Sequence, residues 1–158
     1  MSEVTNEPID PDIEPPGRAE PSHLPVLAVI AAGGLLGALA RYGLARGWPT
    51  PPGAFPWATF VTNVVGCFLI GVLMVVVSEL ITAHRLVRPF LGVGILGGFT
   101  TFSTYANDLR SLLQPGTVAT ALLYLAATLI AALAATLAAV RITRAAAAVL
   151  RDREGVWV

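Results

Sequence analysis

The sequence predicts an all-α integral membrane protein with four transmembrane helices, the third of which is a candidate for a broken helix. Of its 158 residues, 55% are hydrophobic and only 13% are charged, a balance too apolar for an ordinary soluble domain. Four long stretches carry almost no charge, and the third contains a cluster of glycines followed by hydroxyl residues. The ten arginines and ten acids cancel, and this zero net charge excludes a basic nucleic-acid-binding protein.

The N-terminal tail, residues 1–23, differs from everything that follows it. Six of the ten carboxylates lie in its first 20 residues alongside several prolines, a composition typical of a disordered segment. A membrane domain is expected at residues 24–140, because a hydrocarbon core of about 30 Å needs about 20 mostly apolar helical residues for each crossing. Its predicted spans are residues 24–45, 55–78, 89–112 and 117–140.

The first span, residues 24–45, carries a single charge, Arg41. Arg41 follows Gly37 by four residues and Gly33 by eight, so the three share one helical face on which a neighbouring helix can approach closely. Two interpretations of the arginine stay open. Its side chain either reaches the lipid headgroups or supplies a fixed positive charge that attracts an anion.

The second span, residues 55–78, follows the turn sequence WPTPPG at residues 48–53, which cannot continue a helix. Its most polar side chain is Asn63, with Thr59 one turn before it and Gly66 almost one turn after it. A buried amide needs hydrogen-bond partners. Asn63 therefore predicts either an interhelical hydrogen bond or an NH₂ group that faces an ion.

The third span, residues 89–112, is the unusual one because glycine and hydroxyl residues cluster within it. A helix break in a membrane persists only where protein or a water-lined cavity satisfies the freed backbone groups, so the cluster predicts a site. The alternative is close helix packing, which uses the same small residues. Phe102 and Tyr105, three residues apart, could present ring edges to an anion, although packing is the commoner use of such a pair.

The fourth span, residues 117–140, follows a turn with the sequence QPG at residues 114–116. Tyr124, Thr128 and Thr136 form a thin polar line along it, although threonine hydroxyls can also bond to carbonyls of their own helix. An Arg- and Ala-rich cytoplasmic extension, residues 141–158, is expected to continue the helix.

Residues suited to catalysis or metal binding by side chains are missing from the sequence. One cysteine, Cys67, and two histidines give no cluster with metal-ligand spacing, and no nucleophile has a histidine base at a plausible separation. The membrane domain contains only two acids, Glu79 and Asp108, both at predicted span ends. No acid therefore lies deep in a span to couple protons. We expect neither an enzyme nor a proton-coupled exporter.

Three motifs of the chain resemble the CrcB/Fluc family of fluoride channels. They are Gly33-Gly34 through Gly37-Ala38 to Arg41-Tyr42, Thr59 through Val61-Thr62-Asn63 to Gly66, and Gly97-Gly98-Phe99-Thr100-Thr101-Phe102-Ser103-Thr104-Tyr105. The third motif is highly specific, and the other two support it by position. The resemblance covers roughly residues 24–140, with all four spans in the right order.

The resemblance implies two four-helix subunits in an antiparallel, dual-topology dimer, with two fluoride pores and a structural sodium ion (Na⁺) at its centre. The backbone carbonyls of Gly97 and Thr100 of both subunits would hold the sodium ion, since oxygen ligands suit a hard cation. The residues implied for the fluoride pore are Asn63, Phe102, Tyr105, Thr128 and Tyr124, and those implied for the vestibule are Arg41 and Asp108.

The activity implied by the resemblance is passive efflux of fluoride, which lowers its concentration in the cytoplasm. Fluoride is small and strongly hydrated, so a narrow pore must replace its water with hydrogen-bond donors and ring edges. Two residues depart from the family pattern. Tyr105 replaces the second of a pair of phenylalanines and adds a hydroxyl beside the expected ion path, and Asp108 replaces a glutamate.

Arginines are distributed unequally between the two predicted sides of the membrane. With four spans, both termini and the loop at residues 79–88 share one side. The arginines on that side are Arg18, Arg85, Arg88, Arg141, Arg144, Arg151 and Arg153, and those on the other are Arg46 and Arg110. Because arginine-rich loops stay cytoplasmic, the bias predicts a fixed orientation with both termini inside. The location implied by the resemblance is the cell inner (plasma) membrane.

The fixed orientation affects which partner completes an antiparallel dimer. An oppositely oriented paralogue would be required if the orientation is fixed, whereas the family resemblance by itself suggests a second copy of this chain. Two alternatives to an active channel also stay open. The chain could be a non-conducting or half-active subunit of a heterodimer, or a structural protein that only assembles other membrane proteins.

Overall fold

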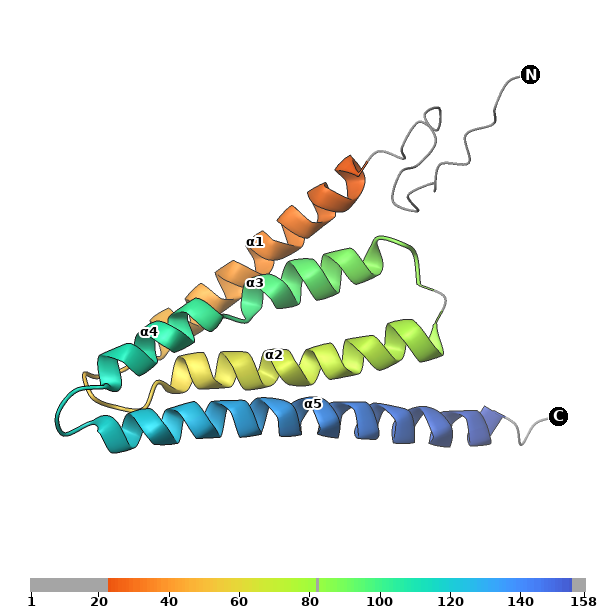
Figure 1. Cartoon of the computed structure of the whole chain (residues 1–158). Coiled ribbons are helices and arrows are strands. Elements are labelled where there is room, and N and C mark those ends of the chain that lie inside the picture. The colour runs from red at the N-terminus through yellow and green to blue at the C-terminus, as the bar shows by residue number, and fades with distance from the viewer. Residues whose placement is uncertain (1–22, 82, 155–158) are drawn as a thin grey trace, which may run out of the picture.

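The computed structural model describes residues 23–81 and 83–154, and every regular element within these ranges is a helix. The elements are α1 Leu24–Gly47, α2 Trp57–Val75, the π-helical turn η1 Val76–Leu80, the π-helical segment η2 Pro89–Leu96, α3 Gly97–Phe99, α4 Phe102–Leu112 and α5 Val118–Glu154 (Figure 1). Most of the predicted N-terminal tail, residues 1–22, and the last four residues, 155–158, lie outside the described residues.

Within the described residues, three helices are long and apolar enough to cross a membrane. They are Leu24–Gly47, Trp57–Leu80 and Val118–Arg151, with mean hydropathies of 1.9, 2.6 and 2.2. These helices coincide with the first, second and fourth spans predicted from the sequence. The third predicted span, residues 89–112, is divided among η2, α3 and α4. The described part of the chain is therefore all-helical, and the protein is a multi-pass membrane protein.

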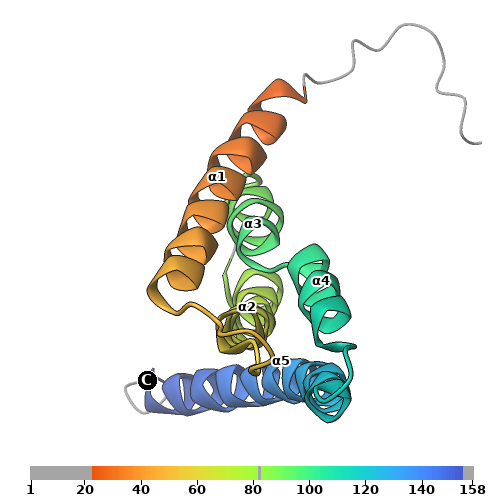
Figure 2. The same cartoon turned by 90° about the vertical axis from the view of Figure 1, so that its left-hand side faces the viewer.

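The helices pack as two pairs. α2 lies alongside α5 over most of its length, and α1 lies against η2 and α3 (Figure 1). α4 leaves the end of α3 and runs toward the start of α5, so it connects the two pairs at one end of the molecule (Figure 2). The break between α3 and α4 is thus positioned between α1 on one side and α2 on the other.

Glycines allow both pairs to pack closely, as the stripe on the first span predicts. A Cβ added to Gly33 would lie 2.5 Å from the Phe90 carbonyl oxygen, and one added to Gly94 would lie 2.9 Å from the Gly33 Cα. In the other pair, a Cβ at Gly71 would lie 2.8 Å from the Ala139 Cβ. Real Cβ atoms do not approach other atoms this closely, so these crossings require glycine.

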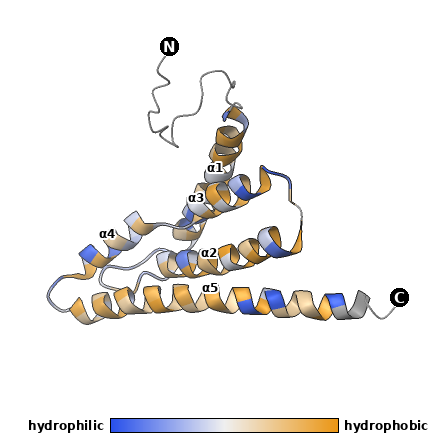
Figure 3. Cartoon of the chain, turned by 45° about the vertical axis from the view of Figure 1, so that its right-hand side comes forward, coloured by the Kyte–Doolittle hydropathy of each residue, from blue (hydrophilic) through white to orange (hydrophobic). Residues whose placement is uncertain are grey.

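Large apolar side chains are exposed along the long helices, as expected of surfaces that face lipid. Leu35 on α1 is 61% exposed and Leu133 on α5 is 67% exposed. Figure 3 shows apolar residues along most of α2 and α5, with hydrophilic residues in the loop after α2 and near the C-terminal end of α5. The buried core is small and joins Tyr105 and Leu112 of α4 to Ala121 and Tyr124 of α5.

α5 continues as one helix well beyond Val140, in agreement with the sequence prediction. Its 37 residues correspond to about 55 Å at about 1.5 Å per residue, which exceeds a hydrocarbon core of about 30 Å. Near the far end, Arg144 forms a bidentate ion pair with Glu79 of η1, with a shortest N–O distance of 2.6 Å. Both side chains are exposed, so the pair contributes little to the stability of the fold.

Candidate functional site

The helical run of the third predicted span is interrupted at Thr100 and Thr101. α3 ends at Phe99 and α4 begins at Phe102, while both threonines have extended backbones, with φ/ψ of −74°/159° at Thr100 and −151°/127° at Thr101. Thr101 is the N-cap of α4, because its hydroxyl oxygen accepts a hydrogen bond from the Thr104 N–H at 3.2 Å. The interruption frees several backbone groups that a continuous helix would pair internally.

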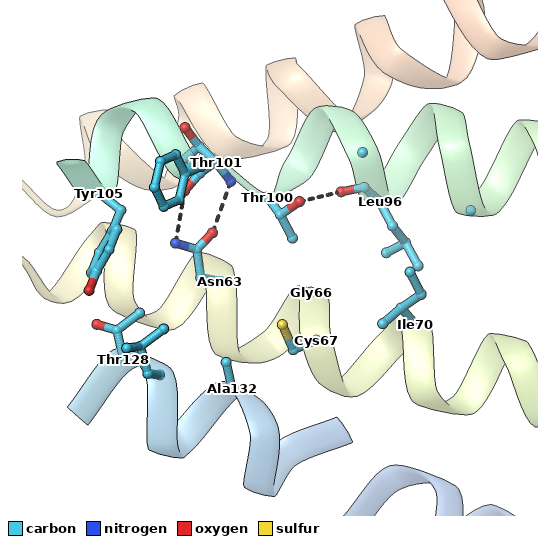
Figure 4. A pocket seen from close by; sticks show the side chains of 14 residues that line it. Asn63, Gly66, Cys67, Ile70, Leu96, Thr100, Thr101, Tyr105, Thr128 and Ala132 are labelled. Carbon is cyan, nitrogen blue, oxygen red and sulfur yellow. Dashed lines mark hydrogen bonds between the residues drawn. The ribbon is translucent and has the colours of Figure 1, made fainter. Parts of the chain in front are cut away.

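Asn63 of α2 binds the backbone of the break through both ends of its amide. Its Nδ2 donates to the Thr101 carbonyl oxygen at 2.9 Å, and its Oδ1 accepts from the Thr101 N–H at 2.9 Å (Figure 4). The interhelical hydrogen bond considered from the sequence is therefore present. One of the two amide N–H bonds is not needed for this pairing, so the same side chain retains a donor for the groove that it lines.

Arg41 of α1 approaches the break from the opposite side. Its Nε donates to the Gly98 carbonyl oxygen at 3.1 Å, and its side chain is half-buried. The glycines permit this approach, because a Cβ on Gly37 would overlap the Ile95 carbonyl oxygen and one on Gly98 would overlap the Gly34 carbonyl oxygen. The guanidinium is thus held against the broken segment and supplies a positive charge there.

Two other carbonyls of the break lose the donors that a helix would give them. In a continuous helix the Gly97 carbonyl accepts from the Thr101 N–H and the Thr100 carbonyl accepts from the Thr104 N–H. Here the Thr101 N–H donates to Asn63 and the Thr104 N–H donates to the Thr101 hydroxyl. The carbonyl oxygens of Gly97 and Thr100 are therefore available as ligands, and their chemistry fits a hard cation.

Side chains offer no comparable cation site in the part of the chain that the structure describes. No three histidine, cysteine, aspartate or glutamate side chains gather there in an arrangement that could hold a metal. Backbone oxygens at the break are the candidate ligands that remain.

An open groove of about 490 Å³ runs beside the break between α2 and α5 (Figure 4). It brings together six of the nine site residues predicted from the sequence, namely Asn63, Gly97, Thr100, Phe102, Tyr105 and Thr128. The Phe102 side chain is 79% exposed, whereas Tyr105 is buried and its hydroxyl donates to the Leu125 carbonyl at 3.2 Å. The Tyr105 hydroxyl is therefore turned toward α5, and the ring edges of the pair are what the groove can offer.

The other three predicted residues lie around the groove without lining it. Arg41 borders a second hollow of about 250 Å³, which Thr59 also lines. Asp108 accepts a hydrogen bond from the Thr59 hydroxyl at 2.7 Å. Tyr124 is fully buried, with its ring centroid 5.1 Å from that of Tyr105.

Two hydroxyls on α5 are buried without a hydrogen bond among the described residues. They are Tyr124 Oη and Thr128 Oγ1, on side chains that are 0% and 5% exposed. Thr136, further along the same polar line, donates to the carbonyls of Cys67 and Ala132 instead. A buried hydroxyl without a partner is costly, so Thr128, which lines the groove, is a candidate for contact with an ion or water. The Tyr124 hydroxyl instead interacts with the side chains of Thr59 and Asp108.

The hydrogen-bond partners of Asn63 and Arg41 could not be predicted from the sequence. The Thr101 backbone as the partner of Asn63 and the Gly98 carbonyl as the partner of Arg41 depend on how the helices cross, which spacing along one helix does not give. The N-cap of α4 was predictable from the sequence, because threonine, here Thr101, is a preferred residue directly before a helix.

The model of one protein family, described as CrcB-like protein, Camphor Resistance (CrcB), matches residues 28–140. The chain belongs to this family. The match to the CrcB-like family includes all nine candidate site residues and ends where the extension of α5 begins.

Several relatives carry names that describe an activity. The protein named "Fluoride-specific ion channel FluC 2" of Nocardia farcinica is 60% identical over 118 residues, covering 75% of this CrcB-like chain and 84% of that protein. The protein named "Fluoride-specific ion channel FluC 1" of Streptomyces coelicolor is 63% identical over 109 residues, covering 69% and 71%. The protein named "Fluoride-specific ion channel FluC 2" of Thermobifida fusca is 53% identical over 132 residues, covering 82% and 93%.

Proposed function

We propose that this protein is a fluoride-specific ion channel that allows passive fluoride efflux and so lowers cytoplasmic fluoride. The observation that carries the proposal is the identity of 60% and 63% to relatives named as fluoride-specific ion channels. The family match spans every candidate site residue. The chain is on this account a transporter and not an enzyme.

The groove supplies the kinds of contact that a dehydrating anion needs. Thr128 carries a hydroxyl with no hydrogen-bond partner among the described residues, and Asn63 retains one N–H beyond its two hydrogen bonds to Thr101. Phe102 adds an exposed ring whose edge carries partial positive charge. A sequence of single donors and ring edges binds fluoride at each step weakly enough for it to leave.

We further propose that residues 89–112 form a fourth crossing, interrupted at Thr100 and Thr101. Support comes from the packing of η2 and α3 along α1, and from the cross-helix bonds of Asn63 and Arg41 to the break. Backbone that leaves the helical pattern at membrane depth persists only where protein satisfies it, as these two side chains do.

The proposed assembly is an antiparallel dimer. A single chain exposes Gly97, the Phe102 ring and the Ser103 hydroxyl beside an open groove, and polar groups facing lipid are costly. A second subunit over this face would close the groove and bring two copies of the break together. The partner is either a second copy of this chain or an oppositely oriented paralogue.

A structural sodium ion at the centre of that dimer is also proposed. The carbonyl oxygens of Gly97 and Thr100 have lost their helical donors and would hold the ion together with those of the second subunit. When bound, sodium would supply positive charge to these backbone oxygens, which have lost their helical hydrogen-bond donors.

The heterodimer alternative keeps one specific observation in its favour, the bias of seven arginines to two across the proposed membrane domain. A tag at the C-terminus tests it. Labelling from the cytoplasmic face alone supports a fixed orientation and an oppositely oriented paralogue, whereas equal labelling from both faces supports a homodimer.

Fluoride tolerance of cells tests the proposed activity. A bacterial strain without its own fluoride exporter is expected to grow at higher fluoride when it produces this chain, or this chain with an oppositely oriented paralogue. Equal amounts of a water-soluble protein serve as the control for expression burden. The proposal fails if the chain is present in the membrane and fluoride tolerance stays at that of the control.

A further inference from the structure

Asn63 lies at the point where the groove and the carbonyls of the break meet. We infer that Asn63 is a positioning residue for the sodium site, because by holding the Thr101 N–H it keeps the Gly97 carbonyl free to bind the cation. The inference rests on the sodium ion of the proposed function. Asn63, which is expected to line the anion path, thus has a second role in cation binding. It acts in this role through the backbone of Thr101.

The first step of the argument concerns a single backbone donor. A continuous helix would direct the Thr101 N–H to the Gly97 carbonyl. In the structure that N–H lies 2.9 Å from the Asn63 Oδ1. The Gly97 carbonyl loses its donor because Asn63 has taken it, so the cation ligand depends on a side chain of a different helix.

The second step concerns why an amide suits this position. The Thr101 backbone presents both a donor and an acceptor, and the Asn63 amide forms a hydrogen bond of 2.9 Å with each. Turning the amide over would place donor against donor and acceptor against acceptor. The pairing therefore fixes the orientation of the amide as well as the backbone of Thr101.

Close packing of the break on α2 supports the same conclusion. Gly66 lies almost one turn after Asn63, and a Cβ added there would overlap the Thr100 Cγ2. Thr100 is therefore seated directly on α2 at the glycine, while Asn63 holds the next residue. The backbone of Thr100 and Thr101 is thus set against α2 on one side of the break.

The expected effect follows from competition between a hydrogen bond and the cation. Without Asn63, the Thr101 N–H is released and can return to the Gly97 carbonyl, so sodium must displace it. A net backbone hydrogen bond of about 1 kcal/mol corresponds to about fivefold in affinity. Removal of the Asn63 acceptor should therefore weaken sodium binding about fivefold or more.

Sodium binding by the purified full-length protein, in its dimeric form, tests the inference. The readout is the NaCl concentration that raises the thermal unfolding temperature by a fixed amount, with N-methylglucamine chloride holding ionic strength constant, because that concentration scales with the dissociation constant for sodium. Asn63→Ala should raise that concentration about fivefold or more. Asn63→Asp keeps an acceptor for the Thr101 N–H but places its second oxygen against the Thr101 carbonyl, so it should weaken sodium binding less than Asn63→Ala does. Cys67→Ala, one turn further along α2 in the same groove, is the matched control and should not change it.

The possible outcomes separate the positioning role of Asn63 from the proposed sodium site itself. Wild-type affinity in Asn63→Ala, or equal weakening in the Ala and Asp variants, overturns the positioning role while leaving the sodium site. A wild-type protein whose unfolding does not respond to sodium overturns both. If Asn63→Ala does not fold, Asn63→Ser replaces it, because a serine hydroxyl is too short to reach Thr101 and should give the same fivefold loss.

Discussion

Thr128 offers the sharpest separation of function from stability in this chain. Its side chain is 5% exposed and its hydroxyl has no hydrogen-bond partner among the described residues. Valine has nearly the same shape without the hydroxyl. In a purely structural role, Thr128→Val should stabilise the protein, because leaving a buried hydroxyl unpaired costs about 1–3 kcal/mol.

In the proposed channel the same substitution should reduce fluoride flux. A hydrogen bond to a charged group contributes about 1.5–3 kcal/mol, so losing this donor from the path should slow flux about tenfold to a hundredfold. The expected result is therefore a protein that unfolds at a higher temperature and conducts less fluoride. Flux is measured with a fluoride electrode on vesicles, and stability by thermal unfolding of the same preparation.

Thr136→Val is the matched control on the same helix. The Thr136 hydroxyl is already used, because it lies 3.1 Å from both the Cys67 and the Ala132 carbonyl oxygens. Its removal should leave flux unchanged and lower stability by about 1 kcal/mol or less. Wild-type flux in Thr128→Val would refute the reasoning, since it would show that the unpaired hydroxyl does not contact the ion.

Three further substitutions test the packing described above. Gly37→Ala should lower the free energy of unfolding by about 1–3 kcal/mol in chemical unfolding, because the new Cβ overlaps the Ile95 carbonyl oxygen. Gly34→Ala is the control and should have no such effect, because its Cβ meets no atom within 4 Å. Equal effects of the two substitutions would contradict the close crossing of α1 with the third span. Tyr105→Phe should cost about 1 kcal/mol by the same measurement, since the Leu125 carbonyl loses its hydroxyl donor; unchanged stability would mean that the bond is not formed. Glu79→Gln should slightly lower the unfolding temperature at low salt and have no effect at high salt, because the Arg144 partner is exposed; an effect that persists at high salt would argue for a different role.

The helices themselves follow largely from composition and small-residue spacing. The predicted spans at residues 24–45 and 117–140 correspond closely to α1 and the membrane part of α5. The glycine stripe predicted a close helix crossing, and Gly33 indeed lies against the backbone of η2. Helix length and a glycine face are local properties, so a single sequence carries them. The start of α2 at Trp57, two residues later than predicted, follows from Pro56, which occupies the N-cap.

The contacts of the site depended on information that spacing does not contain. The sequence marks Asn63 and Arg41 as candidate site residues, but their partners are backbone groups 38 and 57 residues away in the chain. A polar residue in a span shows that a partner is needed without showing which one. The π-helical geometry of η2 also has no signal in the apolar pattern, because that pattern does not show whether backbone hydrogen bonds span four residues or five.

Fluoride efflux from vesicles is the most direct test of the proposed channel. Purified protein is placed in vesicles loaded with potassium fluoride, and a potassium ionophore removes the opposing electrical potential. The account predicts fluoride release faster than from protein-free vesicles, and no matching release of chloride from vesicles loaded with potassium chloride. Fluoride release no faster than that of protein-free vesicles, from this chain alone and together with an oppositely oriented paralogue, would contradict it.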